Sequence, residues 1–172
     1  QAKLAVLLPV ACAIGTSGEI TRLKREIFEE NTLDAVFTLP NEIFYPGASA
    51  SACCMVFKIG TKHNDVSNPD TFFGYCKDDG FKKKKNLGRV EQIDTDTGKS
   101  KWVEIEREWI ELYRNRRSVD GLSATHKVNG DDEWLCEAYM KTDYTKLTEQ
   151  DFQQTINDYL AYLVKEGYVY ES

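Results

Sequence analysis

Residues 33–59 read LDAVFTLPNEIFYPGASASACCMVFKI, and this stretch decides the fold of the chain. Two apolar runs, at 33–39 and 50–59, flank a loop in which Pro40 and Pro46 stand on either side of Phe44 and Tyr45. Short apolar runs bounded by turn residues predict buried β-strands. The loop is too short to hold a crossover helix, so we expect the second strand to pair antiparallel with a neighbour.

The segment before this stretch predicts a strand followed by a helix. Residues 4–8, LAVLL, form a continuous apolar run that ends at Pro9, as is typical of a strand covered on both faces. Thr16 and Glu19 have the spacing of a helix capping box, and Asn31 is a C-terminal stop. A strand, a helix and a strand of these lengths predict a right-handed βαβ crossover. The helix has an apolar face of Ile20, Leu23, Ile27 and Phe28 and an expected solvated face of Arg22, Lys24, Arg25, Glu29 and Glu30.

The rest of the chain predicts one more strand, a polar loop and three helices. Residues 72–76, FFGYC, predict the strand, and residues 77–101 have the composition of a loop. Helices are expected at 101–116, 132–140 and 148–165, the last beginning with Thr148 and Asp151 at capping-box spacing. The side chains expected to be buried on this last helix are Phe152, Ile156, Tyr159, Leu160 and Leu163. These patterns place a domain boundary at residues 80–100.

Composition indicates a soluble globular protein, and the cysteine usage indicates one that works in the cytoplasm. The 172 residues suffice for one domain with a sizeable core, and 41% hydrophobic with 29% charged residues is ordinary for this class. A formal net charge of −6 argues against wholesale wrapping by nucleic acid, but it permits a local basic patch. No run approaches the roughly 20 apolar residues that span a bilayer, so no membrane association is expected.

The cysteines and histidines give no sign of a metal centre. The chain has five cysteines, an odd number without a CxxC pair, and three of them lie within apolar runs. This pattern is typical of reduced, buried thiols and not of a disulfide framework or a zinc site. The two histidines, His63 and His126, are far apart and lack neighbours at ligand spacing.

Two segments are candidates for ligand contact. The loop at 40–47 follows the carboxyl end of a predicted strand, the edge at which open α/β sheets bind ligands. Phe44 in this loop either packs back on the sheet or offers a stacking platform to a planar ligand such as a base. The basic residues Lys82, Lys83, Lys84, Lys85 and Arg89 form either a solvated loop or a contact with DNA phosphates.

The order of these motifs resembles a known family. LAVLLP, then ITRLKREIFEEN, then LDAVFTLPNEIFYPGASASACCMVFK is similar to the second half of the catalytic domain of N6-adenine DNA methyltransferases. The likeness is greatest to the modification subunit of type I restriction-modification systems and related N-6 DNA methylases. It covers roughly residues 3–60 and continues less specifically through YCKDDGFKKKKNLGR and the tryptophan-containing helix.

The resemblance implies a reaction and a set of partners. Such enzymes flip the target adenine out of the duplex and methylate it with S-adenosylmethionine. The aromatic residue of the LP-x-x-x-F element, which is Phe44 here, stacks on the flipped base, and Asn41 and Tyr45 are implied as lining of the same pocket. The implied partners are DNA and the specificity and restriction subunits of a type I system.

The chain also departs from the family pattern. Its four prolines are Pro9, Pro40, Pro46 and Pro69, so the Asn-Pro-Pro-Tyr/Phe catalytic loop is absent, and no strand leads into a glycine-rich cofactor loop. We therefore expect no catalytic, cofactor-binding or metal-binding residue in this chain. The expected fold is α/β: the distal half of a Rossmann-like methyltransferase sheet followed by a helical region.

These expectations divide the chain into the C-terminal part of the catalytic domain at 1–80, a basic linker at 81–100 and a helical tail at 101–172. A fragment of this kind should be inactive alone. Because half of a sheet leaves an apolar edge or face exposed, we also expect self-association or marginal solubility of the isolated chain. The alternatives are a non-catalytic DNA- or subunit-binding module with a degenerate methylase fold, and a complete small α/β protein with no methylase history.

Overall fold

The structure is a computed structural model that describes residues 2–15, 17–48, 50–64 and 67–166. It divides into two compact units, residues 1–141 and residues 142–172. The first unit is a mixed α/β domain built on a five-stranded sheet, and the second contains a short 3₁₀ turn, Tyr144–Lys146, and helix α4, Glu149–Lys165. The division between the two units falls after Lys141.

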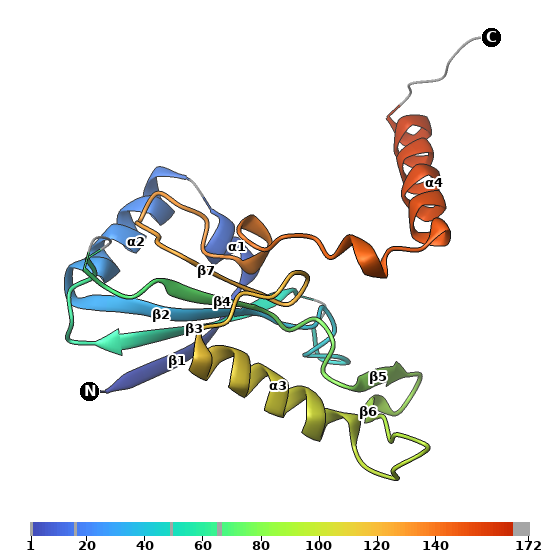
Figure 1. The fold of residues 1–172 in the computed structure, drawn as a ribbon. Helices are drawn as coiled ribbons and strands as arrows, with labels where there is room; N and C mark the ends of the chain where they lie inside the picture. Colours follow the sequence, from blue (N-terminus) through green and yellow to red (C-terminus); the bar gives the residue numbers. More distant parts are fainter. Residues whose placement is uncertain (1, 16, 49, 65–66, 167–172) are drawn as a thin grey trace. The chain divides into compact units, whose positions relative to one another are not determined.

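The sheet has the order β1-β3-β2-β4-β7 and is mostly antiparallel (Figure 1). Its strands are β1 at Lys3–Pro9, β2 at Asn31–Thr38, β3 at Ala52–Ile59, β4 at Thr71–Tyr75 and β7 at Ser123–His126. β3 pairs antiparallel with both β1 and β2, which confirms the expected pairing of the second apolar run. β2 and β4 form the parallel pair. β1 and β2 run in the same direction, as a crossover requires, with β3 inserted between them.

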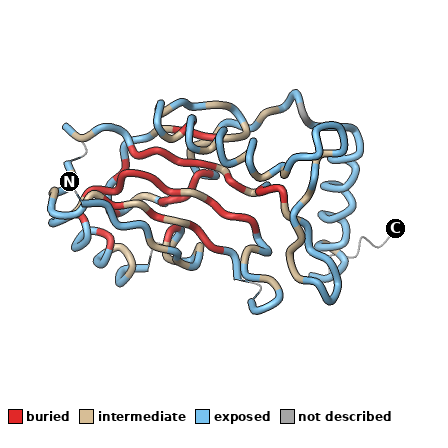
Figure 2. Tube along the Cα trace, turned by 90° about the horizontal axis from the view of Figure 1, so that it is seen from below, coloured by how far each residue is buried: buried red, intermediate tan, exposed pale blue. Residues whose placement is uncertain are grey.

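Helices pack on both faces of the sheet (Figure 1). Helices α1, Val10–Ile14, and α2, Gly18–Glu30, contribute Ala13 and Phe28 to a core cluster with Val36, Met55 and Trp134. Helix α3, Lys101–Asn115, contributes Leu112 to a second cluster on the other face. Figure 2 shows the buried residues concentrated along the central strands between these two layers.

Strand β1 lies at the edge of the sheet, and both of its faces are partly open to solvent. This corrects the expectation that both faces are covered. Leu4 is 50% and Leu7 53% exposed. A continuous apolar run is typical of a strand between two layers, but β1 has a hydrogen-bonded neighbour only in β3 among the described residues.

Helix α2 begins at its cap Ser17, whose hydroxyl accepts a hydrogen bond from the Ile20 amide, and the expected cap Thr16 lies outside the described residues. Leu23 and Ile27, expected to be buried, are exposed. Lys24, expected in solvent, is buried, and its ammonium donates to the backbone oxygens of Ala13, Gly15 and Asp132. These carbonyls lie near the end of α1 and in a distant loop, so the sequence pattern of α2 alone does not reveal them.

The C-terminal half differs most from the expected elements. The presumed linker contains a β-hairpin of β5, Phe81–Lys84, and β6, Gly88–Glu91. The helix expected at 132–140 is reduced to a 3₁₀ turn at Cys136–Ala138, and β7 was not expected. Helices α3 and α4 are confirmed, and α4 has the expected Thr148–Asp151 capping box. The apolar side chains expected to be buried on α4 are exposed, except for the half-buried Leu163.

A buried aspartate joins three strands and a helix. Asp34 lies at a β-bulge of β2, where the register against β3 shifts between Leu33 and Ala35. Its carboxylate lies 2.8 Å from Lys3 Nζ and 3.0 Å from Lys58 Nζ, and it also accepts hydrogen bonds from Tyr113 and Arg116 of the α3 region. Burial by itself raises the pKa of Asp34, but the hydrogen bonds from Lys3, Tyr113, Lys58 and Arg116 outweigh it and hold the pKa well below its usual value.

We expect Asp34→Asn to lower the free energy of unfolding at pH 7 by about 1.5–3 kcal/mol, because hydrogen bonds to a charged group contribute about this much and the partly exposed cations left behind can be hydrated. Urea denaturation of the chain measures this change. The matched control is Glu26→Gln, which removes an exposed pair with Arg22 and should cost no more than about 1 kcal/mol.

The same interaction predicts a pH dependence with a definite sign. A carboxylate whose pKa is depressed in the folded state contributes stability above its unfolded pKa of about 3.9, and this contribution is lost as the pH falls further. The difference in stability between wild type and Asp34→Asn should therefore be constant from pH 7 to about pH 5 and should shrink below about pH 4. A difference that stays constant to pH 2 contradicts the assignment.

Candidate functional site

The loop at 40–47 follows β2 and is folded into consecutive turns. The Leu39 amide donates to the Ala52 carbonyl at 3.1 Å and closes the ladder between β2 and β3. Within the loop, the amide of Tyr45 donates to Glu42 O at 2.9 Å and the amide of Gly47 to Phe44 O at 2.8 Å. Phe44 is 40% exposed and belongs to neither core cluster. The turns thus present an aromatic ring to solvent at the carboxyl end of a strand.

The structure brings the two candidate segments together. Lys83, on β5, places its Nζ 3.0 Å from Glu42 Oε1 and 4.4 Å from the centroid of the Tyr45 ring. Successive side chains of a strand point to opposite faces, so Lys82 and Lys84 point away from this contact. They are exposed, as is Lys85 in the turn that follows β5. The hairpin therefore offers a basic surface on one side and supports the loop with the other.

Arg89 differs from the four lysines. Its Nη2 lies 2.6 Å from Asp79 Oδ1, and the two side chains are only 15% and 10% exposed. The guanidinium also lies over the Phe81 ring, 5.5 Å from its centroid. These contacts tie β6 to the start of β5, so in this structure the charge of Arg89 stabilises the hairpin.

A series of polar side-chain contacts that the sequence did not suggest lies beside the loop. Lys77 Nζ donates to Asn41 Oδ1 at 2.8 Å and lies 4.0 Å from Glu137 Oε1. The other oxygen of Glu137 accepts a 2.7 Å hydrogen bond from Thr38, a fully buried residue. Lys77 directly follows the predicted strand at 72–76, so the rule that ligands bind at carboxyl strand ends could have found it. Glu137 is remote in sequence and carried no such signal.

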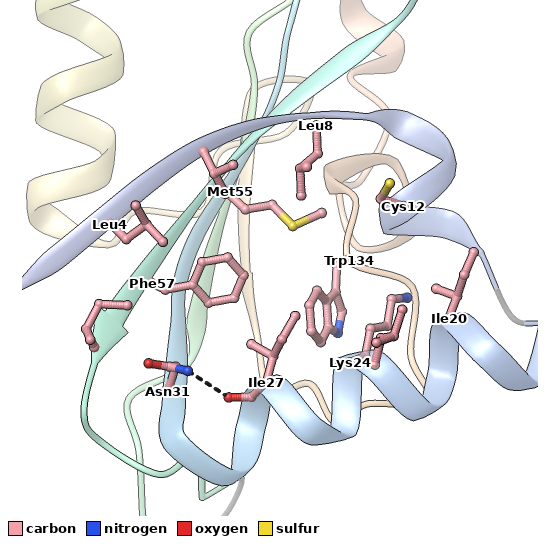
Figure 3. Close-up of a pocket in the computed structure, with 13 residues that line it drawn as sticks. Leu4, Leu8, Cys12, Ile20, Lys24, Ile27, Asn31, Met55, Phe57 and Trp134 are labelled. Carbon is pink, nitrogen blue, oxygen red and sulfur yellow. Dashed lines mark hydrogen bonds between the residues drawn. The ribbon is translucent and has the colours of Figure 1, made fainter.

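An apolar groove of about 390 Å³ lies between β1, β3 and α2 (Figure 3). Its side chains include Leu4, Leu8, Met55 and Phe57 from the strands and Ile27 from the helix, and Trp134 forms part of its wall. The ammonium of Lys24 lies at the groove but is occupied by backbone carbonyls. Desolvation by burial lowers the pKa of Lys24. The lining is mostly apolar and suits the packing of apolar side chains.

The cysteines are free thiols, with Cys53, Cys76 and Cys136 buried. Desolvation by burial raises the pKa of Cys53 to about 11 and that of Cys136 to about 12, so both thiols are protonated and unsuited to nucleophilic attack at neutral pH. Among the described residues no group of three or more His, Cys, Asp or Glu side chains could hold a metal ion. No helix in the described part of the chain is long and apolar enough to cross a membrane.

Comparison with known proteins identifies the family. The profile of the N-6 DNA methylase family matches residues 1–167. The chain belongs to the N-6 DNA methylase family. It is 28% identical over 176 residues to the type II restriction enzyme and methyltransferase RM.BcgI of Heyndrickxia coagulans, an alignment that covers 98% of the chain and 26% of the relative. This N-6 DNA methylase chain thus spans about a quarter of the length of that curated relative.

Solved structures share the fold. The methyltransferase subunit of the type I restriction-modification system from Streptococcus thermophilus superimposes with a TM-score of 0.58 at 20% identity, over 81% of this chain and 26% of that one. A chain from a structure that addresses assembly and conformational transition of a type I system gives a TM-score of 0.51 at 12% identity, over 96% of this chain and 35% of that one. These structures show the fold, and the match of the family profile to residues 1–167 confirms the family resemblance inferred from the sequence motifs.

Proposed function

We propose that this chain forms the distal part of the catalytic domain of an adenine-N6 DNA methyltransferase of the type I modification-subunit kind. The whole enzyme would transfer a methyl group from S-adenosylmethionine to adenine in DNA. The observation that carries the proposal is the family match over residues 1–167 together with an exposed aromatic ring, Phe44, at the carboxyl end of β2. Open α/β sheets bind their ligands at this edge.

The open side of the sheet supports a place in a larger Rossmann-like domain. In this proposal a further strand, earlier in the sequence, pairs parallel with the free edge of β1. Successive crossovers that are right-handed and progress in one direction place their helices on the same face of a sheet. The helix that leads into β1 would then lie beside α2 and fill the apolar groove around Leu23 and Ile27. The catalytic and cofactor loops would belong to that preceding part, and the chain alone would be inactive.

Three residues of the loop take different parts in the proposal. Asn41 and Tyr45 are engaged by Lys77 and Lys83, whereas the ring of Phe44 is open to solvent. Phe44 is therefore the residue that we assign to stacking on the flipped base, with Asn41 and Tyr45 as neighbours in the pocket wall. The exposed apolar residues of α4 suit a contact with the specificity or restriction subunits.

Phe44→Ala in the full-length protein should reduce methyl transfer from radiolabelled S-adenosylmethionine to DNA by roughly 10- to 100-fold, because stacking of one base on an aromatic ring contributes about 1–3 kcal/mol. Phe44→Trp, which keeps a stacking surface, is the matched control and should retain most of the activity. Equal melting temperatures of the three proteins show that the fold is intact.

The same assay separates the alternatives. If Phe44→Ala leaves the activity of the full-length protein unchanged, Phe44 is a packing residue. An inert full-length protein, tested with its specificity subunit present, favours a non-catalytic DNA- or subunit-binding module. Methyl transfer by the 172-residue chain alone contradicts the assignment of the catalytic loop to the preceding part.

The basic hairpin should contact DNA phosphates through its exposed lysines. The double variant Lys82→Gln, Lys84→Gln should weaken binding to all DNA sequences alike. It should also reduce the slope of log K against log salt concentration by about 2, since each phosphate contact adds about 0.9. Fluorescence anisotropy at several salt concentrations measures both quantities. Lys62→Gln, which removes an exposed lysine paired with Glu29, is the control and should leave the slope unchanged.

The isolated chain should self-associate through the open groove. Leu23 and Ile27 are 45% and 38% exposed there, and a charge among them should weaken the contact. We expect Leu23→Glu to shift the chain toward monomer in sedimentation velocity, whereas Arg22→Glu, a charge change at the exposed neighbouring position, should not. If the wild-type chain is monomeric at high concentration, the groove is not a surface that the rest of the whole protein covers, and this part of the proposal is wrong.

A further inference from the structure

A series of polar contacts lies at the carboxyl ends of the parallel strands β2 and β4, and the proposed function does not yet assign it a role. Thr38 and Tyr75 are partners in the register, and the Cys76 amide donates to the Thr38 carbonyl at 2.8 Å. Lys77 is the next residue, directly after this ladder contact, and its side chain reaches the loop that follows β2. A lysine anchored in this way connects the rigid sheet to the loop that carries Phe44.

Lys77 is held on one side and holds the loop on the other. Its Nζ lies 4.0 Å from Glu137 Oε1, while Glu137 Oε2 accepts the 2.7 Å hydrogen bond from the fully buried Thr38. On the loop side, Nζ donates to Asn41 Oδ1 at 2.8 Å, and Ser51 Oγ donates to the same oxygen at 3.4 Å. The amide oxygen of Asn41 thus receives two donors, which decides the flip of the amide and leaves its NH₂ group to donate to a ligand.

Lys83 also contacts the loop, through an ion pair with Glu42 and through the Tyr45 ring, and its side chain is the more exposed of the two lysines. The side chains of Lys83 and Glu42 are 46% and 49% exposed, and an ion pair at this exposure contributes no more than about 1 kcal/mol and is screened by salt. The side chains of Lys77 and Glu137 are 27% and 38% exposed, and Glu137 is hydrogen-bonded to the hydroxyl of the buried Thr38. The difference in burial favours Lys77 as the contact that sets where the loop begins.

We propose that Lys77, oriented by Glu137, is a positioning residue that fixes the start of the 40–47 loop and the amide of Asn41, and thereby places Phe44 against the flipped base. The inference rests on the proposed methyltransferase function for its last step. Its first step, control of the loop by Lys77, concerns the protein without DNA and is independent of that function.

The test compares Lys77→Met, Lys77→Arg and the control Lys62→Met in the full-length protein. Hydrogen exchange without DNA should be about tenfold faster in Lys77→Met at the amides of Tyr45 and Gly47, which close the loop turns. The kcat for methyl transfer should fall about 10- to 100-fold, because a small misplacement of a positioning group carries that penalty. The KM for S-adenosylmethionine should not change. Lys77→Arg keeps a cationic donor and should restore most of both properties.

Loop exchange equal to that of the wild type in Lys77→Met overturns the proposal. If, in addition, the salt slope of DNA binding falls by about 1 in Lys77→Met, Lys77 is a direct phosphate contact instead. A wild-type protein that transfers no methyl group with its specificity subunit present refutes the proposed function, and the exchange data then still decide whether Lys77 controls the loop. Lys62→Met should match the wild type in every measurement.

Discussion

The buried carboxylate of Asp34 is the interaction on which the rest of this structure depends. An isolated carboxylate in the interior costs several kcal/mol, so the fold must supply compensating donors. Lys3 and Lys58 supply them from β1 and β3, and Tyr113 and Arg116 supply them from the α3 region. The contact therefore ties β1 and β3 to the bulged strand β2 and holds α3 against the sheet.

The bulge at Asp34 also sets which side chains of β2 face which layer. The extra residue lets Leu33 and Val36 share the core beneath α2, while Ala35 packs on the α3 side. Beyond the bulge the strand alternates regularly up to Thr38, at the edge where β2 and β4 end together. The position of the loop that carries Phe44 therefore follows from the register that this bulge imposes on β2.

The two sides of the domain are finished differently. On the side near β4, the strand β7 pairs with β4, and the 3₁₀ turn at Cys136–Ala138 lies beside β2 and β4. Glu137 in this turn accepts a hydrogen bond from Thr38 of β2. The side near β1 presents an open strand edge and an apolar groove. The chain spans about a quarter of the length of its curated relative. Its open surface lies where the proposed Rossmann-like sheet would continue. Its polar edge lies where the proposed base pocket is.

The sequence by itself determined the central strands, the long helices and the loop of Phe44, because these depend on local apolar patterns, prolines and caps. Tertiary structure decided the rest. Lys24 is buried because remote carbonyls need a donor, and β5 and β6 exist because cross-strand pairing stabilises residues whose polar composition indicates a loop. The contacts of Lys77 with Asn41 and Glu137 join residues 36 and 60 positions apart, and only the folded chain brings such residues together.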